Sequence, residues 1–478
     1  MTVTLTLETE DRERLWRKLV EHIEDYAETL DEQPVSRPVS AAEVRAEVAA
    51  FDFDRSLTPE VALDRVADLL LRTQVHTPHA DYYGLFNPNP TTMGIAGDAL
   101  AAAFNPQLAA WSHSPAACEI EQHVLREMGA RFGYDPARLA GSFTSGGAEA
   151  NHTAVLCALT TAFPEFGEEG VAAIVGKPVL YVTEESHHSF VKAARLCGLG
   201  TQAVRRVPVD EHFTMDPQAL AAAIAVDRSA GHQPFLVVAT LGTTNAGLID
   251  PIDEIVEIAI TENLWLHADA AWGGAAALVP DLRPHLGAIE RADSITFDAH
   301  KWLSVPMGAG IFLTRHQHAP RRTFSIATDY MPVLGTEVID PHLTTMQWSR
   351  RFIGLKVFLS LAVAGWEGYA EAISHQAEMG RLLRLRLIES GWQVLNKTPL
   401  PTLCWVDSAG ADNSPERLDA ICRHVVDSGH AWISTTRLAG RVPVLRATIT
   451  NYRTDESNIE RLIEALDRAR TAQPREDS

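Results

Sequence analysis

The chain has 478 residues and a formal net charge of −21, with 41 Lys and Arg against 62 Asp and Glu. A balance this acidic, with no basic patch beyond short pairs such as Arg205-Arg206, excludes binding to nucleic acid or to an anionic membrane surface. The five scattered cysteines show no Cys-x-x-Cys spacing, so we expect reduced thiols and no metal site. With no apolar run of about 18–20 residues and no signal-peptide pattern, we predict a soluble cytoplasmic protein.

The first predicted elements are amphipathic helices. Residues 9–31 carry apolar side chains at helical spacing. A second helix is predicted after Thr58-Pro59, where the threonine caps and the proline occupies the first turn. Both helices carry much apolar surface. We therefore predict that residues 1–85 form an N-terminal helical segment that packs on a partner subunit.

An alternation of strands and helices begins near residue 140. Short β-rich runs that are apolar on both faces lie at 178–183, 234–240, 264–269 and 309–314. Such runs are typical of a mostly parallel sheet covered by helices, and ligands of these sheets bind at the carboxyl ends of the strands. We therefore predict a large α/β domain over residues 86–365, with its chemistry near the strand ends Thr183, Thr240 and Asp269.

The pattern of predicted helices and strands changes after about residue 345. Helices are predicted at roughly 348–365 and 368–390. The strands that follow, near 392–396, 403–407 and 444–450, alternate with helices. This pattern favours a smaller α+β domain over residues 366–478.

The strongest chemical signal is a pair of charged residues at the ends of apolar runs. Asp269 ends the run Leu264-Trp-Leu-His-Ala-Asp, and Lys301 follows Ser294-Ile-Thr-Phe-Asp-Ala-His. A buried ammonium or carboxylate is costly unless pairing or chemistry requires it. Pyridoxal phosphate (PLP) needs both, a lysine for the Schiff base and a carboxylate that keeps the pyridinium nitrogen protonated. A helix-capping aspartate and a surface lysine are the alternative interpretation.

Three further turns favour the same site. The small-residue turn at 144–151 feeds a helix whose N-terminus could hold a phosphate. His187-His188 follows one predicted strand, and the hydroxyl-rich turn at 241–247, with Thr244, follows the next. Each feature alone is also consistent with an ordinary turn or a surface histidine. Together, and in this order, they predict a cofactor site.

With these motifs, and above all with Asp298-Ala-His-Lys-Trp302, residues 10–470 resemble the group II PLP-dependent amino-acid decarboxylases. That family includes the aromatic-L-amino-acid and glutamate decarboxylases. The resemblance implies an α/β protein of PLP fold type I, like aspartate aminotransferase, with a mainly parallel seven-stranded sheet. It implies that Lys301 carries the cofactor as an internal aldimine, that Asp269 binds the pyridine nitrogen, and that His188 stacks on the ring and helps to place the substrate carboxylate. The further cofactor contacts that it implies are Ala271 and Thr244 near the ring, and Gly146, Gly147, Ala148 and His300 at the phosphate.

The resemblance also identifies residues 324–331 as a loop that closes over the site. In the family, the tyrosine of this loop, here Tyr330, donates a proton to the α-carbon after carbon dioxide leaves. Relatives that make aldehydes often have phenylalanine at this position or asparagine at the stacking histidine. Tyr330 and His188 therefore favour simple decarboxylation. Asp298 departs from the pattern, because family members often carry asparagine there, and its role stays open.

The resemblance implies a substrate pocket formed by Thr77, Leu85, Phe86, Gln107 and Arg446, with a structural ion pair as the alternative for Arg446. Thr77 and Leu85 stand where aromatic decarboxylases tend to have a tryptophan and a tyrosine, which predicts a roomier and more polar pocket. We expect a homodimer. We expect it to convert an L-amino acid to its amine and carbon dioxide, with an aromatic amino acid favoured over an acidic or another polar one. An aldehyde synthase, an aminotransferase and a non-catalytic PLP-binding protein are the alternatives.

Overall fold

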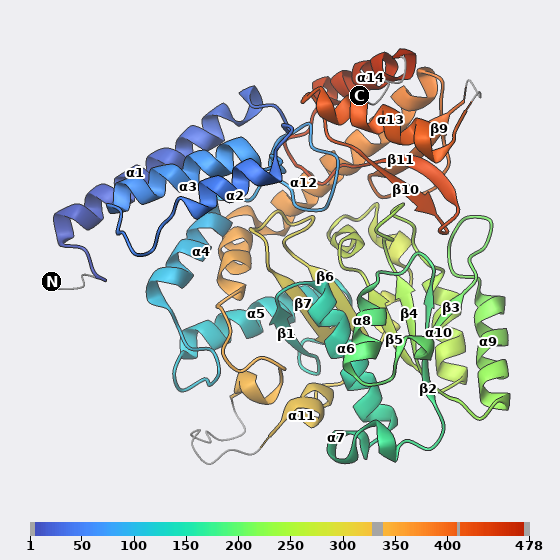
Figure 1. Cartoon of the computed structure of the whole chain (residues 1–478). Helices are drawn as coiled ribbons and strands as arrows, with labels where there is room; N and C mark the ends of the chain where they lie inside the picture. Colours follow the sequence, from blue (N-terminus) through green and yellow to red (C-terminus); the bar gives the residue numbers. More distant parts are fainter. Residues whose placement is uncertain (1–4, 327–337, 409–411, 473–478) are drawn as a thin grey trace.

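The computed structural model describes residues 5–326, 338–408 and 412–472. Three helices, α1 (Thr9–Thr29), α2 (Ala41–Ala49) and α3 (Pro59–Thr73), form the N-terminal part. Figure 1 shows α1 and α3 side by side at one edge of the molecule. The pair is joined by ion pairs such as Arg14 to Glu60 at 2.9 Å and Lys18 to Asp64 at 2.9 Å.

The centre of the molecule is a sheet of seven strands in the order β1-β7-β6-β5-β4-β2-β3. The strands are β1 (Ala140–Thr144), β2 (Pro178–Thr183), β3 (Val204–Val207), β4 (Gln233–Thr240), β5 (Trp265–Asp269), β6 (Ser294–Asp298) and β7 (Gly310–Thr314). Only β7 runs antiparallel to its neighbours, and the other pairs are parallel. The predicted fold class and the mainly parallel seven-stranded sheet are confirmed.

Both faces of the central strands are buried, which explains why β2 and β4 carry apolar residues on both faces. The α-helices of the region are α4 (Thr92–Phe104), α5 (Pro115–Arg131), α6 (Gly147–Ala162), α7 (Phe166–Glu169), α8 (Ser189–Leu196), α9 (Pro217–Ser229), α10 (Ile252–Thr261) and α11 (Ala319–Phe324). In β4, Leu236 and Val238 pack with α6 and α8, whereas Val237 and Ala239 pack with α5, α9 and α10. Successive side chains of a strand point to opposite faces, so a sheet covered on both sides needs an unbroken apolar run.

A second, smaller sheet follows in the chain. Its strands β8 (Trp392–Val394), β9 (Thr402–Asp407), β10 (Ser434–Leu438) and β11 (Val442–Thr448) are all antiparallel, in the order β10-β11-β9-β8. The helices α12 (Gly354–Glu389), α13 (Pro415–Asp427) and α14 (Glu456–Thr471) belong to this half of the chain. The two helices predicted here correspond to the two helical segments of α12, which are separated by the non-helical backbone of Gly365, where φ is 64°. The interruption coincides with the predicted boundary at residue 365, and the boundaries themselves stay predictions.

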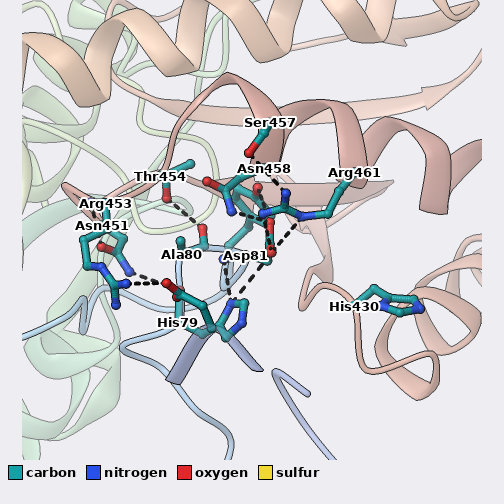
Figure 2. Close-up of polar contacts among 12 residues, drawn as sticks. His79, Ala80, Asp81, His430, Asn451, Arg453, Thr454, Ser457, Asn458 and Arg461 are labelled. Atoms are coloured by element: carbon teal, nitrogen blue, oxygen red, sulfur yellow. Dashed lines mark hydrogen bonds and ion pairs between the residues drawn. The ribbon is translucent and has the colours of Figure 1, made fainter. Parts of the chain in front are cut away.

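A segment of turns and bends at 78–86 is bound to the C-terminal part of the chain. Asn451 and Thr454 donate hydrogen bonds to the carbonyl oxygens of residues 78–80. The buried carboxylate of Asp81 accepts hydrogen bonds from Asn458 at 2.8 Å and from Arg461 at 3.0 Å (Figure 2). These bonds fix the backbone that ends at Phe86, next to the site described below. Among the described residues, no helix is long and apolar enough to cross a bilayer.

Candidate active site

A cavity of about 220 Å³ lies where β4, β5 and β6 end and α6 begins. The predicted residues that line it are Gly146, Gly147, Ala148, Thr244, Asp269, Ala271 and Lys301. The unassigned residues that join them are Asn151, His187, Thr240, Gly242, Trp272 and Asp298. The residues converge because parallel strands present their carboxyl ends at one edge of the sheet. Within the described ranges, no group of three or more His, Cys, Asp or Glu side chains could hold a metal ion.

Lys301 lies in the turn that follows β6. Its backbone N–H donates to the carbonyl oxygen of Asp298 at 3.1 Å. Its ammonium group lies 2.9 Å from Asp298 Oδ2 and 5.7 Å from the centre of the Phe86 ring. The surface-lysine interpretation is therefore excluded, because this ammonium faces a cavity lined by a buried carboxylate.

Asp269, the last residue of β5, is only 4% exposed. Burial raises the pKa of this carboxyl, and the opposing influences are the charges of Lys301 and His187 and the hydrogen bonds from Asn151 and the Ala271 amide. Asn151 Nδ2 donates to Oδ2 at 2.9 Å, and the amide of Ala271 donates to Oδ1 at 3.2 Å. Two donors therefore fix the orientation of the carboxylate.

The donor to Asp269 is itself held by a buried histidine. His267 is fully buried, and desolvation lowers its pKa to about 3, so the ring is neutral near pH 7. Its Nε2 lies 3.0 Å from Asn151 Oδ1, and its Nδ1 lies 2.8 Å from Ser294 Oγ. Asn151 Oδ1 can only accept, so Nε2–H of His267 donates to it. Nδ1 of the neutral ring then accepts from the hydroxyl of Ser294, whose oxygen also accepts from Trp265 at 2.8 Å. The amide nitrogen of Asn151 is thereby directed to Asp269.

Sequence reasoning did not assign a role to Asn151, although the motif at 144–151 ends on it. The available signal was its position five residues after Gly146, which is one helical turn inside α6 and on the side that faces the strand ends. Its two partners, Asp269 and His267, are two residues apart on β5 and therefore lie on the same face of the strand. Only the packing of α6 on the sheet brings these three residues together.

The histidine at the cavity is His187. It lines the cavity, remains open to solvent on one side, and has its pKa lowered by desolvation, with the charges of Asp269 and Lys301 acting on it. His188, the residue predicted from the resemblance, is the N-cap of α8 and is not among the lining residues. The role of His188 at the cofactor ring stays a prediction. Adjacent residues at a strand-to-helix turn point in different directions, and sequence alone does not choose between two consecutive histidines.

The predicted substrate residues separate into two groups. Phe86 stacks on Trp272 of the cavity wall, with the ring centres 4.8 Å apart at 29°. Thr77, Leu85 and Gln107 are not among the residues that line the cavity. The Leu85 side chain is 57% exposed, and Gln107 Oε1 accepts from the amide of Ala109 at 3.1 Å. His300, predicted at the phosphate, approaches Gly146 but accepts from the amide of Ala309 through Nδ1.

Arg446 is a buried guanidinium behind Phe86. It is 3% exposed, and its guanidinium carbon lies 5.2 Å from the centre of the Phe86 ring. It donates to the carbonyl oxygens of Thr244, Asn245 and Gly84 at 2.7–3.1 Å. Its Nη2 has no hydrogen-bond partner among the described residues, and no carboxylate is among the groups whose charge acts on it. The structural ion-pair interpretation is therefore not supported.

The residues of the cavity fit a phosphorylated, planar aldehyde cofactor. The first amides of α6 have no partner within the helix and can hold an anion. A side chain at Gly147 would lie 2.8 Å from Asp298 Oδ2, so glycine keeps this approach open. Lys301 supplies an amine and Asp269 an oriented carboxylate, and the small side chain of Ala271 leaves room for a flat ring.

Comparisons with known proteins agree with this geometry. A family model described as the pyridoxal-dependent decarboxylase conserved domain matches residues 51–405. An aromatic-L-amino-acid decarboxylase of Bacillus atrophaeus is 30% identical over 463 residues, which cover 95% of this chain and 94% of that relative. This chain belongs to the pyridoxal-dependent decarboxylase family. The resemblance stated from the motifs is thereby confirmed.

Two further relatives indicate the range of this decarboxylase family. A 4-hydroxyphenylacetaldehyde synthase of Rhodiola rosea is 26% identical over 454 residues, which cover 93% of this chain and 92% of that relative. The crystal structure of Oryza sativa TDC with PLP and tryptamine has a TM-score of 0.92 and 25% identity, covering 98% of this chain and 99% of that chain. The predicted cofactor and enzyme class are confirmed: the protein is a PLP-dependent amino-acid decarboxylase.

Proposed function

We propose that this decarboxylase converts an aromatic L-amino acid to the corresponding amine and carbon dioxide. The observation that carries the proposal is a cavity lined by Lys301 and an oriented Asp269 carboxylate, with the aromatic ring of Phe86 stacked on Trp272 of its wall. Bacillus and rice relatives named for aromatic amino acids support an aromatic substrate.

Each residue then has a defined task. PLP, when bound, supplies an electron sink that makes loss of the α-carboxylate possible. Asp269 would hold the ring nitrogen in its protonated form, since a negative charge fixed by Asn151 stabilises a positive charge beside it. Lys301 would bind the aldehyde and carry a proton on Nζ when the product leaves. Tyr330, proposed as the proton donor to the α-carbon, lies outside the described residues.

A second substrate class is favoured by one observation. The unpaired Nη2 of Arg446 is a buried donor beside Phe86, and a buried donor without an acceptor is costly. A side-chain carboxylate or another acceptor on the substrate would satisfy it. An acidic or polar L-amino acid is therefore the alternative to an aromatic one.

A screen of amino acids for carbon dioxide release tests both versions. Tyrosine, tryptophan, phenylalanine, dopa, glutamate and aspartate would be compared by the rate of carbon dioxide release and by the organic product. We expect an amine from an aromatic substrate. Aldehyde with peroxide would identify an aldehyde synthase, a keto acid would identify an aminotransferase, and no release from any amino acid would refute the proposal.

The two adjacent histidines allow a matched pair of variants. We propose that His187, and not His188, contacts the cofactor ring, so we expect His187→Gln to weaken PLP binding by up to about tenfold, since an aromatic contact contributes about 0.5–1.5 kcal/mol. Decarboxylation should fall as well. His188→Gln should stay within about twofold of the wild type, which is the scale of a surface change. A PLP titration followed by absorbance measures both, and the reverse ranking would restore the assignment to His188.

We further propose that the decarboxylase is a homodimer that buries the apolar face of α1 and α3. On α1, Trp16 (55%), Val20 (55%) and Ile23 (37%) are exposed at helical spacing, and on α3 Val61 (40%) and Leu70 (51%) are exposed. Exposed apolar side chains gathered on one helix face, as on α1, are typical of an interaction site. The cytoplasmic location stays a prediction.

Replacing Trp16 with glutamate is expected to raise the dimer dissociation constant at least about thirtyfold. A charge at the centre of an apolar interface removes a contact of the kind that contributes about 2 kcal/mol or more. Sedimentation equilibrium measures the change. Val226→Glu is the control, because Val226 is 68% exposed on α9, and a wild-type monomer at micromolar concentration would contradict the proposal.

A further inference from the structure

Asp298 is a buried carboxylate with one unsatisfied oxygen. The residue ends β6 and is 1% exposed. Its Oδ2 lies 2.9 Å from Lys301 Nζ, whereas its Oδ1 has no hydrogen-bond partner among the described residues. A buried acceptor without a donor is unfavourable. Oδ1 of Asp298 can therefore accept a hydrogen bond from a donor that the surrounding described residues do not supply.

The carboxylate faces the N-terminus of α6. A Cβ atom at Gly147 would lie 2.8 Å from Oδ2 and 3.4 Å from Oδ1, so the side chain and the first turn of the helix are in contact. The amides of that turn, at Gly147 and Ala148, have no partner within the helix and can hold an anionic phosphate. A phosphate at this position has a second anion as its immediate neighbour.

The groups around Asp298 do not neutralise it permanently. Lys301 is the residue that engages the cofactor aldehyde, so its ammonium is not a fixed partner. His300 Nε2 lies 4.0 Å from Oδ2, and burial lowers the pKa of this ring, which keeps it neutral near pH 7. From β5 and the start of α8, Asp269 and His187 also line the cavity.

The remaining charges nearby are committed to other partners. Lys356 of α12, whose charge acts on His300, donates to the carbonyl oxygen of Met307 at 2.8 Å and to Asp98 at 3.3 Å. Glu149 of α6 accepts hydrogen bonds from Ser145 and Gln347. Two anions in contact in a buried site either repel each other or share a proton.

We propose that the decarboxylase binds PLP as the singly protonated phosphate, whose P–OH group donates a hydrogen bond to Oδ1 of Asp298. The inference rests on the proposed function only in that PLP occupies the cavity of Lys301. The second pKa of a phosphate monoester is about 6, so free PLP is a dianion at neutral pH. Binding then takes up one proton from solvent, and no bond to phosphorus is made or broken. An asparagine at this position would instead donate N–H to a dianion.

Phosphorus NMR of the holoenzyme tests the protonation state directly. We expect the bound phosphate of the wild type to resonate at the chemical shift of monoanionic PLP between about pH 7 and pH 9, because the pairing with Asp298 retains the proton. In Asp298→Asn the resonance should move to the dianion position. A wild-type resonance at the dianion position would overturn the proposal, and this result needs no variant to fold.

Cofactor affinity supplies an independent measurement. Binding of PLP to the wild type takes up a proton, whereas binding to Asp298→Asn does not. The PLP dissociation constant of the wild type, divided by that of Asp298→Asn, should therefore rise about tenfold per pH unit above pH 7. Glu254→Gln, an exposed change of the same charge on α10, should behave like the wild type. A ratio that does not change with pH would mean simple repulsion and would also overturn the proposal.

These outcomes are distinct from those of the proposed function. A wild-type protein that binds PLP and releases no carbon dioxide from any amino acid would refute decarboxylation. The phosphorus resonance and the pH dependence of PLP affinity would still decide the role of Asp298 in that case.

Discussion

Replacing Lys301 with alanine is expected to eliminate the Schiff-base absorbance of the decarboxylase and to reduce decarboxylation by at least about a thousandfold. The amine binds the cofactor aldehyde and also moves a proton, and loss of positioned proton transfer alone typically costs about 10²–10⁴-fold in rate. The Nζ atom lies at the cavity, 5.7 Å from the Phe86 ring centre, and no second lysine lines the cavity among the described residues.

Borohydride reduction followed by peptide mapping measures the covalent link, and carbon dioxide release measures the rate. The matched control is Lys177→Ala, at an exposed lysine just before β2, which should keep the absorbance and the rate of the wild type. If Lys301→Ala retained a reducible link to PLP at any lysine together with normal turnover, the assignment of the site would be refuted.

Replacing Asp269 with asparagine is expected to lower the rate of decarboxylation by about 10²–10³-fold while leaving the link to Lys301 intact. The side chain keeps its shape but loses the negative charge that favours a protonated ring nitrogen, and removal of one preorganised electrostatic group typically costs this much. Asn151 Nδ2, 2.9 Å away, would then face an amide, and the orientation set by His267 would no longer be matched.

The measurement is a comparison of kcat with the amount of cofactor trapped by borohydride. Asp269→Glu is the companion variant, because it keeps the charge with an altered position and should retain more activity than Asp269→Asn. Equal activity in the wild type and Asp269→Asn would show that the carboxylate has no electrostatic role.

The fold could be predicted because the sheet is buried on both faces. Runs such as 234–239 are apolar at every position, a pattern that few structures other than a covered parallel sheet require. The break near Gly365 was also predictable. A glycine with φ of 64° separates two helical segments of α12 without a separate loop, where the sequence predicted one helix to end and the next to begin.

The site could be predicted only in part. Lys301, Asp269 and the turn at Gly146 and Gly147 carry residue types that their chemistry requires, at the ends of recognisable strands. The residues of a pocket wall could not be predicted in this way, because their position depends on how separate elements approach one another. Leu85 and Gln107 were expected in the substrate pocket, yet neither is among the residues that line the cavity.

By itself, the sequence determined the alternation of strands and helices, the family, and the pair of charges that the cofactor needs, since each depends on residue type and local periodicity. Tertiary packing alone decided which of two consecutive histidines reaches the cavity, that Asn151 orients Asp269, and that Asp298 faces the first turn of α6. The physical reason is that these contacts join residues far apart in the chain, and their directions are set by the packing of α6 and α8 on the sheet.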